Sequence, residues 1–120
     1  MEYLLMALED EDAFAARADP DRSEAYWSSW QGYLAALASS GVLRGAGGLD
    51  APSLATTVRV RDGKRLVQDG PFADSKEQLG GYFVLDLPDI DAALMWAERC
   101  PASAYGSVEV RPLLPAPSGA

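Results

Sequence analysis

The chain is organised around residues 69–83, which read Asp-Gly-Pro-Phe-Ala-Asp-Ser-Lys-Glu-Gln-Leu-Gly-Gly-Tyr-Phe. This stretch combines a turn dipeptide, a proline that fixes its own backbone angle, four charged side chains and a glycine pair. Residues 57–68 before it and residues 82–87 after it have the composition of strands. A segment this polar between two strands is expected to be a defined connection whose side chains have fixed directions.

Four further features predict where strands and turns lie. Residues 3–8 are apolar at every position, which is typical of a central strand covered on both faces. Residues 42–47 favour a short second strand, and residues 108–111 a last one with Val108 and Val110 on one face. Asp62-Gly63 is a strong hairpin signal between two alternating runs. Gly80-Gly81 favours a bend or bulge at the start of the next strand.

Two segments have apolar residues at the spacing of helices. Residues 9–20, between the first strand and the first helix, read as a loop that can include a short helical turn. The first helix is predicted over residues 22–39, with Asp21 as N-cap and Glu24 completing a capping box. Gly41 ends it. The second helix starts after Pro88 and Asp89 and ends before Pro101. Its expected buried face consists of Ile90, Ala93, Leu94 and Ala97.

The resulting order is strand, helix, strand, hairpin, strand, helix, strand. Two helices on one mainly antiparallel sheet give an α+β two-layer sandwich, and two split βαβ units make it ferredoxin-like. Residues 1–114 are expected to form one domain, and residues 115–120 a disordered tail. Because one sheet face has no helices, an apolar surface there would need a second copy to cover it, and we expect a homodimer.

Composition excludes several classes of function. The net charge of −8 and pI near 4.3 argue against binding nucleic acid. No apolar run is long enough for a membrane helix, and no basic leader precedes the first strand. Cys100 is the single cysteine and histidine is absent, so we expect a cytoplasmic location and no metal site. No cofactor is expected.

The central stretch resembles a known family. Residues 69–77, Asp-Gly-Pro-Phe-Ala-Asp-Ser-Lys-Glu, are similar to the signature Asp-Gly-Pro-Phe-Ala-Glu-Thr-Lys-Glu of the DGPF branch of the YCII-related proteins. Residues 78–82 and 108–112 and the opening strand resemble that family too. The resemblance implies a dimeric α/β barrel, in which two ferredoxin-like sheets pack face to face. It implies no particular reaction.

One departure from the family limits what the resemblance implies. Other YCII-related proteins are thought to use a His-Asp pair as a catalytic dyad, and this chain has no histidine. If Asp69 takes the place of that aspartate, it works without its partner.

Asp69 and Glu77 are the candidate catalytic residues. A carboxylate at a strand end beside a rigid turn can serve as a general base, whereas a purely structural Asp69 would accept backbone hydrogen bonds in an Asx turn. Glu77 can act as acid or base. Lys76 is a candidate for holding an anionic ligand. The structural alternative pairs these side chains with Arg59, Arg61 or Arg111.

The remaining candidate ligand-binding residues are Trp30, Tyr33, Tyr82, Arg59 and Arg111. Trp27, Trp30 and Tyr33 can line an aromatic pocket, although a stripe at helical spacing favours helix-to-sheet core, most clearly for Trp27. Tyr82 can point its hydroxyl into a cleft or pack at a dimer seam. Cys100 is expected to be a buried filler rather than a reactive thiolate.

Two functions remain open from the sequence. The first hypothesis is a dimeric module that binds a small molecule, or a protein partner in regulation, in a cleft near the central stretch. The alternative is a cofactor-independent enzyme of the lyase, isomerase or cyclase type with Asp69 as general base. The missing histidine favours the binding module slightly.

Overall fold

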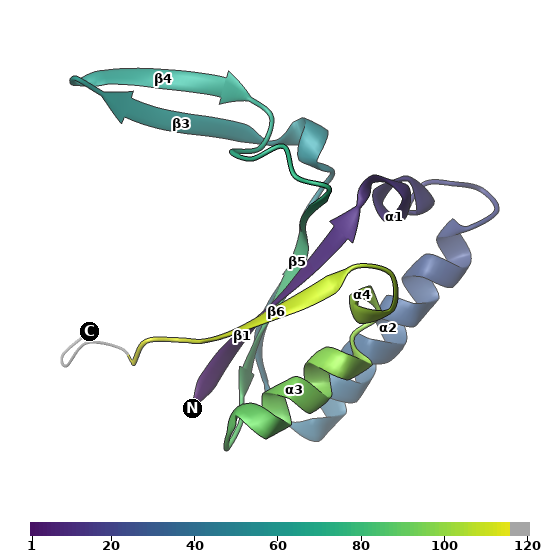
Figure 1. Cartoon of the computed structure of the whole chain (residues 1–120). Helices are drawn as coiled ribbons and strands as arrows, with labels where there is room; N and C mark the ends of the chain where they lie inside the picture. The colour runs from purple at the N-terminus through teal and green to yellow at the C-terminus, as the bar shows by residue number, and fades with distance from the viewer. Residues whose placement is uncertain (116–120) are drawn as a thin grey trace.

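The computed structural model describes residues 1–115, and its layout is shown in Figure 1. Apart from Pro115, the predicted C-terminal tail lies outside these residues. The elements in chain order are β1 (Glu2–Asp10), α1 (Glu11–Ala16), α2 (Ser23–Ser40), β2 (Leu43–Gly48), η1 (Pro52–Leu54), β3 (Thr56–Arg61), β4 (Lys64–Asp69), β5 (Glu77–Asp86), α3 (Ile90–Arg99), α4 (Ala102–Tyr105) and β6 (Ser107–Pro112).

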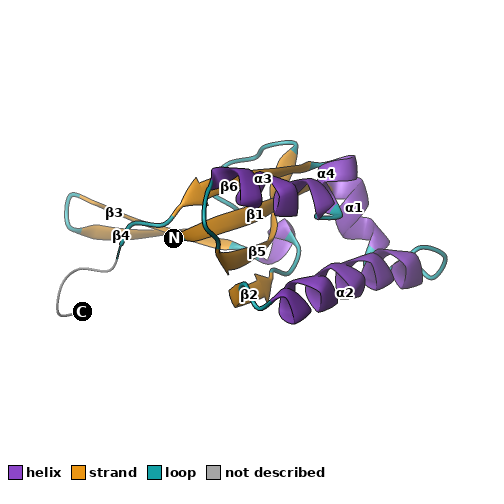
Figure 2. Cartoon of the chain, turned by 90° about the horizontal axis from the view of Figure 1, so that it is seen from below, coloured by secondary structure: helices purple, strands orange, loops and turns teal. Residues whose placement is uncertain are grey.

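Four strands form an antiparallel sheet in the order β2-β5-β1-β6. The chain passes from β1 through α2 to β2, and from β5 through α3 to β6. Each helix therefore connects two strands that have a third strand between them, which is the split βαβ arrangement. Figure 2 shows the helices on one side of the sheet. The predicted α+β ferredoxin-like sandwich is confirmed.

The core lies between one face of the main sheet and the apolar face of α2. Alternate residues of the strands and residues three or four apart on α2 point into it. In β1 the side chains of Tyr3, Leu5 and Ala7 are buried under the helices. On α2 the buried residues are Tyr26, Trp30, Tyr33 and Leu37. The indole of Trp30 stacks on Phe83 of β5, with ring centroids 6.0 Å apart.

Three local predictions differ from the structure. Arg22, not Asp21, is the N-cap of α2, and it makes no side-chain cap. The turn is instead closed by Asp19, whose carboxylate accepts from the Asp21 amide at 2.8 Å. Within the predicted loop, residues 11–16 form the helix α1, which is longer than the expected short turn and is capped by Asp10, whose side chain accepts from the Ala13 amide at 2.9 Å. The strand predicted over residues 82–87 begins earlier, at Glu77 of β5.

The buried face of α3 is also rotated from the predicted one. Ile90 and Leu94 are exposed, whereas Ala93, Trp96 and Ala97 are buried. The small alanines allow the helix to lie close to the sheet, and Trp96 then fills the space toward α2. The Trp96 carbonyl accepts a hydrogen bond from the Tyr33 hydroxyl at 2.8 Å. This contact makes Tyr33 a core residue.

The hairpin and bulge predictions are confirmed. Asp62 and Gly63 have φ angles of 53° and 75°, as a type I′ turn requires, and they join β3 to β4. In the β1–β5 ladder the register passes from Ala7 with Gly81 to Leu8 with Leu79. Gly80 is thereby left without a paired residue in β1, which is the geometry of a β-bulge.

No helix among residues 1–115 lies on the second face of the sheet (Figure 1). Leu4, Met6 and Leu8 point to this side from β1, with Tyr82 and Val84 beside them on β5. The two valines of β6 share one face, as predicted, and this face lies toward the helices, whereas Glu109 and Arg111 face away. We call the surface formed by Leu4, Met6, Leu8, Tyr82 and Val84 the uncovered face.

Replacing Gly32 with alanine is expected to raise the free energy of unfolding by about 1 kcal/mol, because glycine inside a helix costs backbone entropy. Gly32 lies in the exposed part of α2, and no atom lies within 4 Å of where its Cβ would stand. Urea unfolding of the two proteins measures the difference. A less stable variant would contradict the helical geometry at this position.

Candidate functional site

Glu9 is buried at the end of β1, with only 1% of its surface exposed. Its position follows from the alternation of the strand. The side chains two, four and six residues earlier all face the helices, so the ninth residue faces them as well. A carboxylate in such a place needs hydrogen-bond donors, because burying it without them is costly.

Three side chains supply these donors. The hydroxyls of Tyr26 and Tyr105 both donate to Oε2 of Glu9, each at 2.7 Å. Nη2 of Arg17 donates to Oε1 at 3.1 Å. The three residues come from α2, from the short helix α4 and from the end of α1. Helices from both halves of the fold therefore meet at one carboxylate, and we call these four residues the Glu9 cluster.

Arg17 ties the cluster to the edge of the sheet. Its guanidinium donates to the carbonyl of Gly80 at 3.1 Å, to that of Leu49, and to the Tyr26 hydroxyl at 3.2 Å. It also lies 4.6 Å from the centroid of the Phe14 ring. Burial by itself would lower the pKa of Arg17, but the hydrogen bonds to Tyr26 and Glu9 outweigh it, and its pKa is raised.

The phenols of the cluster remain protonated at neutral pH. Burial, reinforced by the hydrogen bond to Glu9, raises the pKa of Tyr26 above its ordinary value. The same two causes raise the pKa of Tyr105. Both hydroxyls therefore act as donors to the carboxylate.

A pocket of about 680 Å³ opens in front of this cluster. Glu9 and Arg17 lie at its polar end, and Trp27, Trp30 and Phe83 contribute aromatic surface. Residues 46–50, from the end of β2 and the following loop, also line the pocket. An apolar pocket of this size with a few converging polar groups is typical of a small-molecule site.

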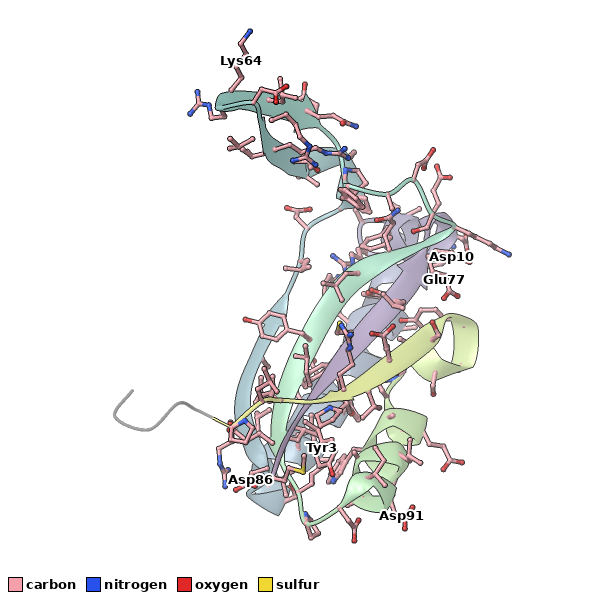
Figure 3. All side chains as sticks on the ribbon, turned by 60° about the vertical axis from the view of Figure 1, so that its left-hand side comes forward. Tyr3, Asp10, Lys64, Glu77, Asp86 and Asp91 are labelled. Carbon is pink, nitrogen blue, oxygen red and sulfur yellow. The ribbon has the colours of Figure 1, made fainter. Side chains whose placement is uncertain are left out.

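A second hollow, of about 1090 Å³, lies between α1 and the loop before β5. Its lining includes Lys76 and several acidic residues, Asp10 and Asp74 among them. Figure 3 shows Asp10 and Glu77 close together at this end of the sheet. No group of His, Cys, Asp or Glu among residues 1–115 is arranged to hold a metal ion.

The two predicted catalytic residues lie away from the pocket. Asp69 is exposed at the end of β4, and its carboxylate has no hydrogen-bond partner among residues 1–115. The neighbouring turn is closed by the backbone, with the Gly70 amide donating to the Ala55 carbonyl at 2.7 Å. Glu77 is half-buried and accepts from the Ser107 hydroxyl at 2.6 Å.

The predicted ligand-binding residues are dispersed over the fold. Trp30 lines the pocket and Lys76 the second hollow. Arg59 lies on β3 with its guanidinium 4.7 Å from the Phe72 ring centroid. Tyr82 is on the uncovered face, over Gly47. Arg111 is an exposed residue of β6, 3.7 Å from the Glu109 carboxylate.

Trp27 differs from the prediction that placed it in the core. It is 43% exposed, because it lies one position beyond the buried residue Tyr26 on α2. Its indole nitrogen donates to the Arg17 carbonyl at 3.0 Å, which fixes the ring at the wall of the pocket. Cys100, by contrast, is buried as predicted, and burial raises the pKa of its thiol to about 11.

The sequence interpretation identified none of the four residues of the Glu9 cluster as site residues. One signal was present. Extending the inward face of the first strand by two residues reaches Glu9, the one charged side chain in that series. No comparable signal exists for Tyr105, which is 96 residues away from Glu9 in the chain.

The folded protein is expected to lose stability as the pH rises above about 10, the ordinary pKa of tyrosine. Burial raises the pKa of Tyr26, Tyr33 and Tyr105. Above pH 10 the unfolded chain releases phenolic protons that the folded chain keeps. The contribution of these tyrosines to the free energy of unfolding is therefore complete below pH 10 and is lost as the pH rises above it. An absorbance titration should show these three tyrosines ionising only on unfolding. Ionisation of all five tyrosines near pH 10 in the folded state would contradict their burial.

The YCII-related domain model matches residues 1–117. The chain belongs to the YCII-related family. A curated relative, an uncharacterised protein of Rhizobium meliloti (strain 1021), is 44% identical over 61 residues. That match covers 49% of this YCII-related chain and 49% of the relative, so the chain aligns with about half of that protein's length.

A solved structure resembles this YCII-related protein with a TM-score of 0.54 and 14% sequence identity. The match covers 95% of this chain and 94% of the chain in the solved structure. It is 5-chloro-2-hydroxyhydroquinone dehydrochlorinase from Burkholderia phenoliruptrix AC1100, in complex with 2,5-dihydroxybenzoquinone. At this identity the likeness shows a shared fold. Within residues 1–115, no helix has both the length and the apolar character needed to span a membrane.

Proposed function

We propose that this YCII-related protein binds a small, flat, oxygen-bearing molecule in the pocket in front of Glu9. The observation that carries the proposal is a carboxylate with 1% exposure at the polar end of an aromatic-walled pocket. A buried ion pair is weak support for stability, because desolvation offsets much of its attraction. The arrangement is easier to explain if it serves a ligand.

The lining defines the chemistry of the ligand. The rings of Trp27 and Trp30 offer aromatic surface to a planar molecule. Arg17 and the tyrosine hydroxyls place donors near Glu9, and the carboxylate accepts hydrogen bonds. A planar ring with hydroxyl or carbonyl oxygens combines both features. The dehydrochlorinase of the same fold is complexed with such a molecule, 2,5-dihydroxybenzoquinone, which supplies a probe.

Calorimetric titration of the full chain with 2,5-dihydroxybenzoquinone tests the proposal. We expect saturable binding to the wild type and a Kd about tenfold higher for Trp27→Ala, which removes one aromatic wall at little cost to the core. Leu94→Ala is the matched control, because Leu94 is an exposed helical residue outside the pocket. Equal Kd values for Trp27→Ala and wild type would refute the assigned pocket.

A second candidate function is a cofactor-independent enzyme. The observation in its favour is that a buried carboxylate, two phenols and a guanidinium converge at one end of the pocket. Glu9 can take a proton from a ligand hydroxyl, and Arg17 can stabilise the resulting anion. This proposal assigns the base to Glu9, whereas the sequence predicts Asp69. Turnover lost in Glu9→Gln and kept in Asp69→Asn would favour Glu9, and the reverse result would favour Asp69.

We also propose a homodimer that packs through the uncovered face. Leu4, Met6 and Leu8 are half-buried there, no helix of the described part of the chain covers them, and a contiguous apolar surface favours association. Sedimentation velocity at micromolar concentration tests this proposal. A stable monomer would refute it. The predicted regulatory partner and cytoplasmic location stay predictions.

A further inference from the structure

The β3–β4 hairpin has little packing of its own. Its two strands form a separate sheet and project away from the side of the main sheet that carries the helices (Figures 1 and 2). The radius of gyration is 16.3 Å, whereas a compact chain of this length has about 14 Å. An isolated two-stranded hairpin is marginally stable in water. We call residues 56–69 the arm.

One face of the arm carries three exposed valines, with Arg65 opposite Val60 on the same face. The register pairs Val58 with Val67, and Val60 lies two residues further along on the same face. These valines are 57%, 57% and 61% exposed. Exposed β-branched residues next to open strand edges promote pairing with another chain. The valine face, Val58, Val60 and Val67, is therefore a docking surface.

On the opposite face, the residues of β3 nearest the base of the arm contact their own chain, whereas Leu66 of β4 is 50% exposed. The Thr57 hydroxyl donates to the Gly70 carbonyl at 2.9 Å. The guanidinium of Arg59 covers the Phe72 ring at 4.7 Å. These contacts fix the arm to the loop at its base and leave the valine face directed outward.

The charge of the arm indicates the kind of partner. It contains four of the ten basic residues of the chain, Arg59, Arg61, Lys64 and Arg65, and two of the 18 acidic ones, Asp62 and Asp69. Its net charge is therefore +2, and that of the other 106 residues is −10. A basic arm with an apolar face is complementary to an acidic surface that has an apolar centre.

The chain itself presents such a surface. Acidic residues border the apolar residues of the uncovered face, with Glu2 preceding Leu4 on the same side of β1 and Glu109 opposite Met6 on β6. One basic residue of β6, Arg111, also lies on this face, 3.7 Å from the Glu109 carboxylate. The arm projects toward this side of the sheet, beyond the edge of its own protomer (Figure 1). A second copy seated on the uncovered face would lie beside the arm.

We propose that the arm packs its valine face against a second copy of this chain, docked on the uncovered face. The inference rests on the homodimer proposed above. In a two-fold dimer the contact is reciprocal, so each protomer is held by the arm of the other. The arm thereby stabilises the dimer, and burying its valines in the partner explains why a hairpin with exposed valines extends away from its own chain.

Sedimentation equilibrium of the full-length triple variant Val58→Thr, Val60→Thr and Val67→Thr tests the arm. Threonine keeps the β-branched shape, so the hairpin is retained while its face becomes polar. We expect the dimer Kd to rise about tenfold or more. The matched control is Leu94→Gln with Met95→Gln, which makes exposed positions of α3 polar and should leave the Kd unchanged.

The outcomes separate the arm from the dimer. A monomeric wild type at about 10 μM would overturn both proposals. A dimer whose Kd is the same in the triple variant would overturn the arm alone. If the variant does not fold, hydrogen exchange of the wild type decides. Slow exchange of the amides of residues 56–69 in the dimer, lost on dilution, supports the arm, and fast exchange at both concentrations refutes it.

Discussion

Replacing Glu9 with glutamine is expected to lower the free energy of unfolding by about 3 kcal/mol, because removing one member of a buried ion pair leaves the other uncompensated. Glu9 accepts from Arg17 on Oε1 and from Tyr26 and Tyr105 on Oε2, whereas a glutamine amide has one acceptor oxygen and one donor nitrogen, so either the phenols or the guanidinium would face a donor. The Arg17 guanidinium would lose its acidic partner. Urea unfolding monitored by circular dichroism measures the change.

Asp86→Asn is the matched control for this substitution. Asp86 is also a strand carboxylate with two cationic partners, Arg44 and the N-terminal ammonium, but all of these groups are exposed. Exposed pairs contribute little, so the control should unfold almost like the wild type. If Glu9→Gln were as stable as Asp86→Asn, the Glu9 cluster would not be the buried network that we describe.

Replacing Gly80 with alanine is the second substitution with a large expected effect. The added Cβ would overlap Oε1 of Glu9 and lie 3.1 Å from Nη2 of Arg17. A free carboxylate could rotate away at little cost, but this one is held by three donors. We expect the free energy of unfolding to fall by about 2 kcal/mol, as for other overpacked sites.

Ligand binding separates this effect from ordinary crowding in a strand. Gly80→Ala displaces the carboxylate at the pocket, so it should weaken 2,5-dihydroxybenzoquinone binding about tenfold or more. Gly45→Ala is the control, because its Cβ would meet only Val84 of the neighbouring strand at an ordinary 3.9 Å. Unchanged binding in Gly80→Ala would contradict the role of Glu9 in the pocket.

Most of the fold was predictable from local patterns. Alternation in the strands, the three- and four-residue spacing of α2 and the Asp62-Gly63 turn each depend on neighbouring residues. These patterns fix the order of elements, and the order leaves few topologies. The buried face of α3 was not predictable in the same way. The small side chains of Ala93 and Ala97 are buried because the helix packs closely on the sheet, and in this orientation Leu94 is exposed to solvent.

The candidate site was harder to predict because its residues meet only in the folded chain. The conspicuous stretch at residues 69–77 placed Asp69 at the centre of the sequence hypotheses, yet Asp69 is exposed. Glu9 stands in a run of acidic residues that resembles a solvated loop. It is buried because β1 continues to Asp10, two residues beyond the end of the apolar run at residues 3–8. Arg17 carries no local signal at all.

The most direct test of the account is a calorimetric titration of wild type, Glu9→Gln and Asp69→Asn with 2,5-dihydroxybenzoquinone. The pocket described here predicts that Asp69→Asn binds like the wild type, and that Glu9→Gln, checked for folding by circular dichroism, has a Kd higher by about tenfold or more. Wild-type affinity in Glu9→Gln together with lost binding in Asp69→Asn would contradict it and place the site at the loop before β5.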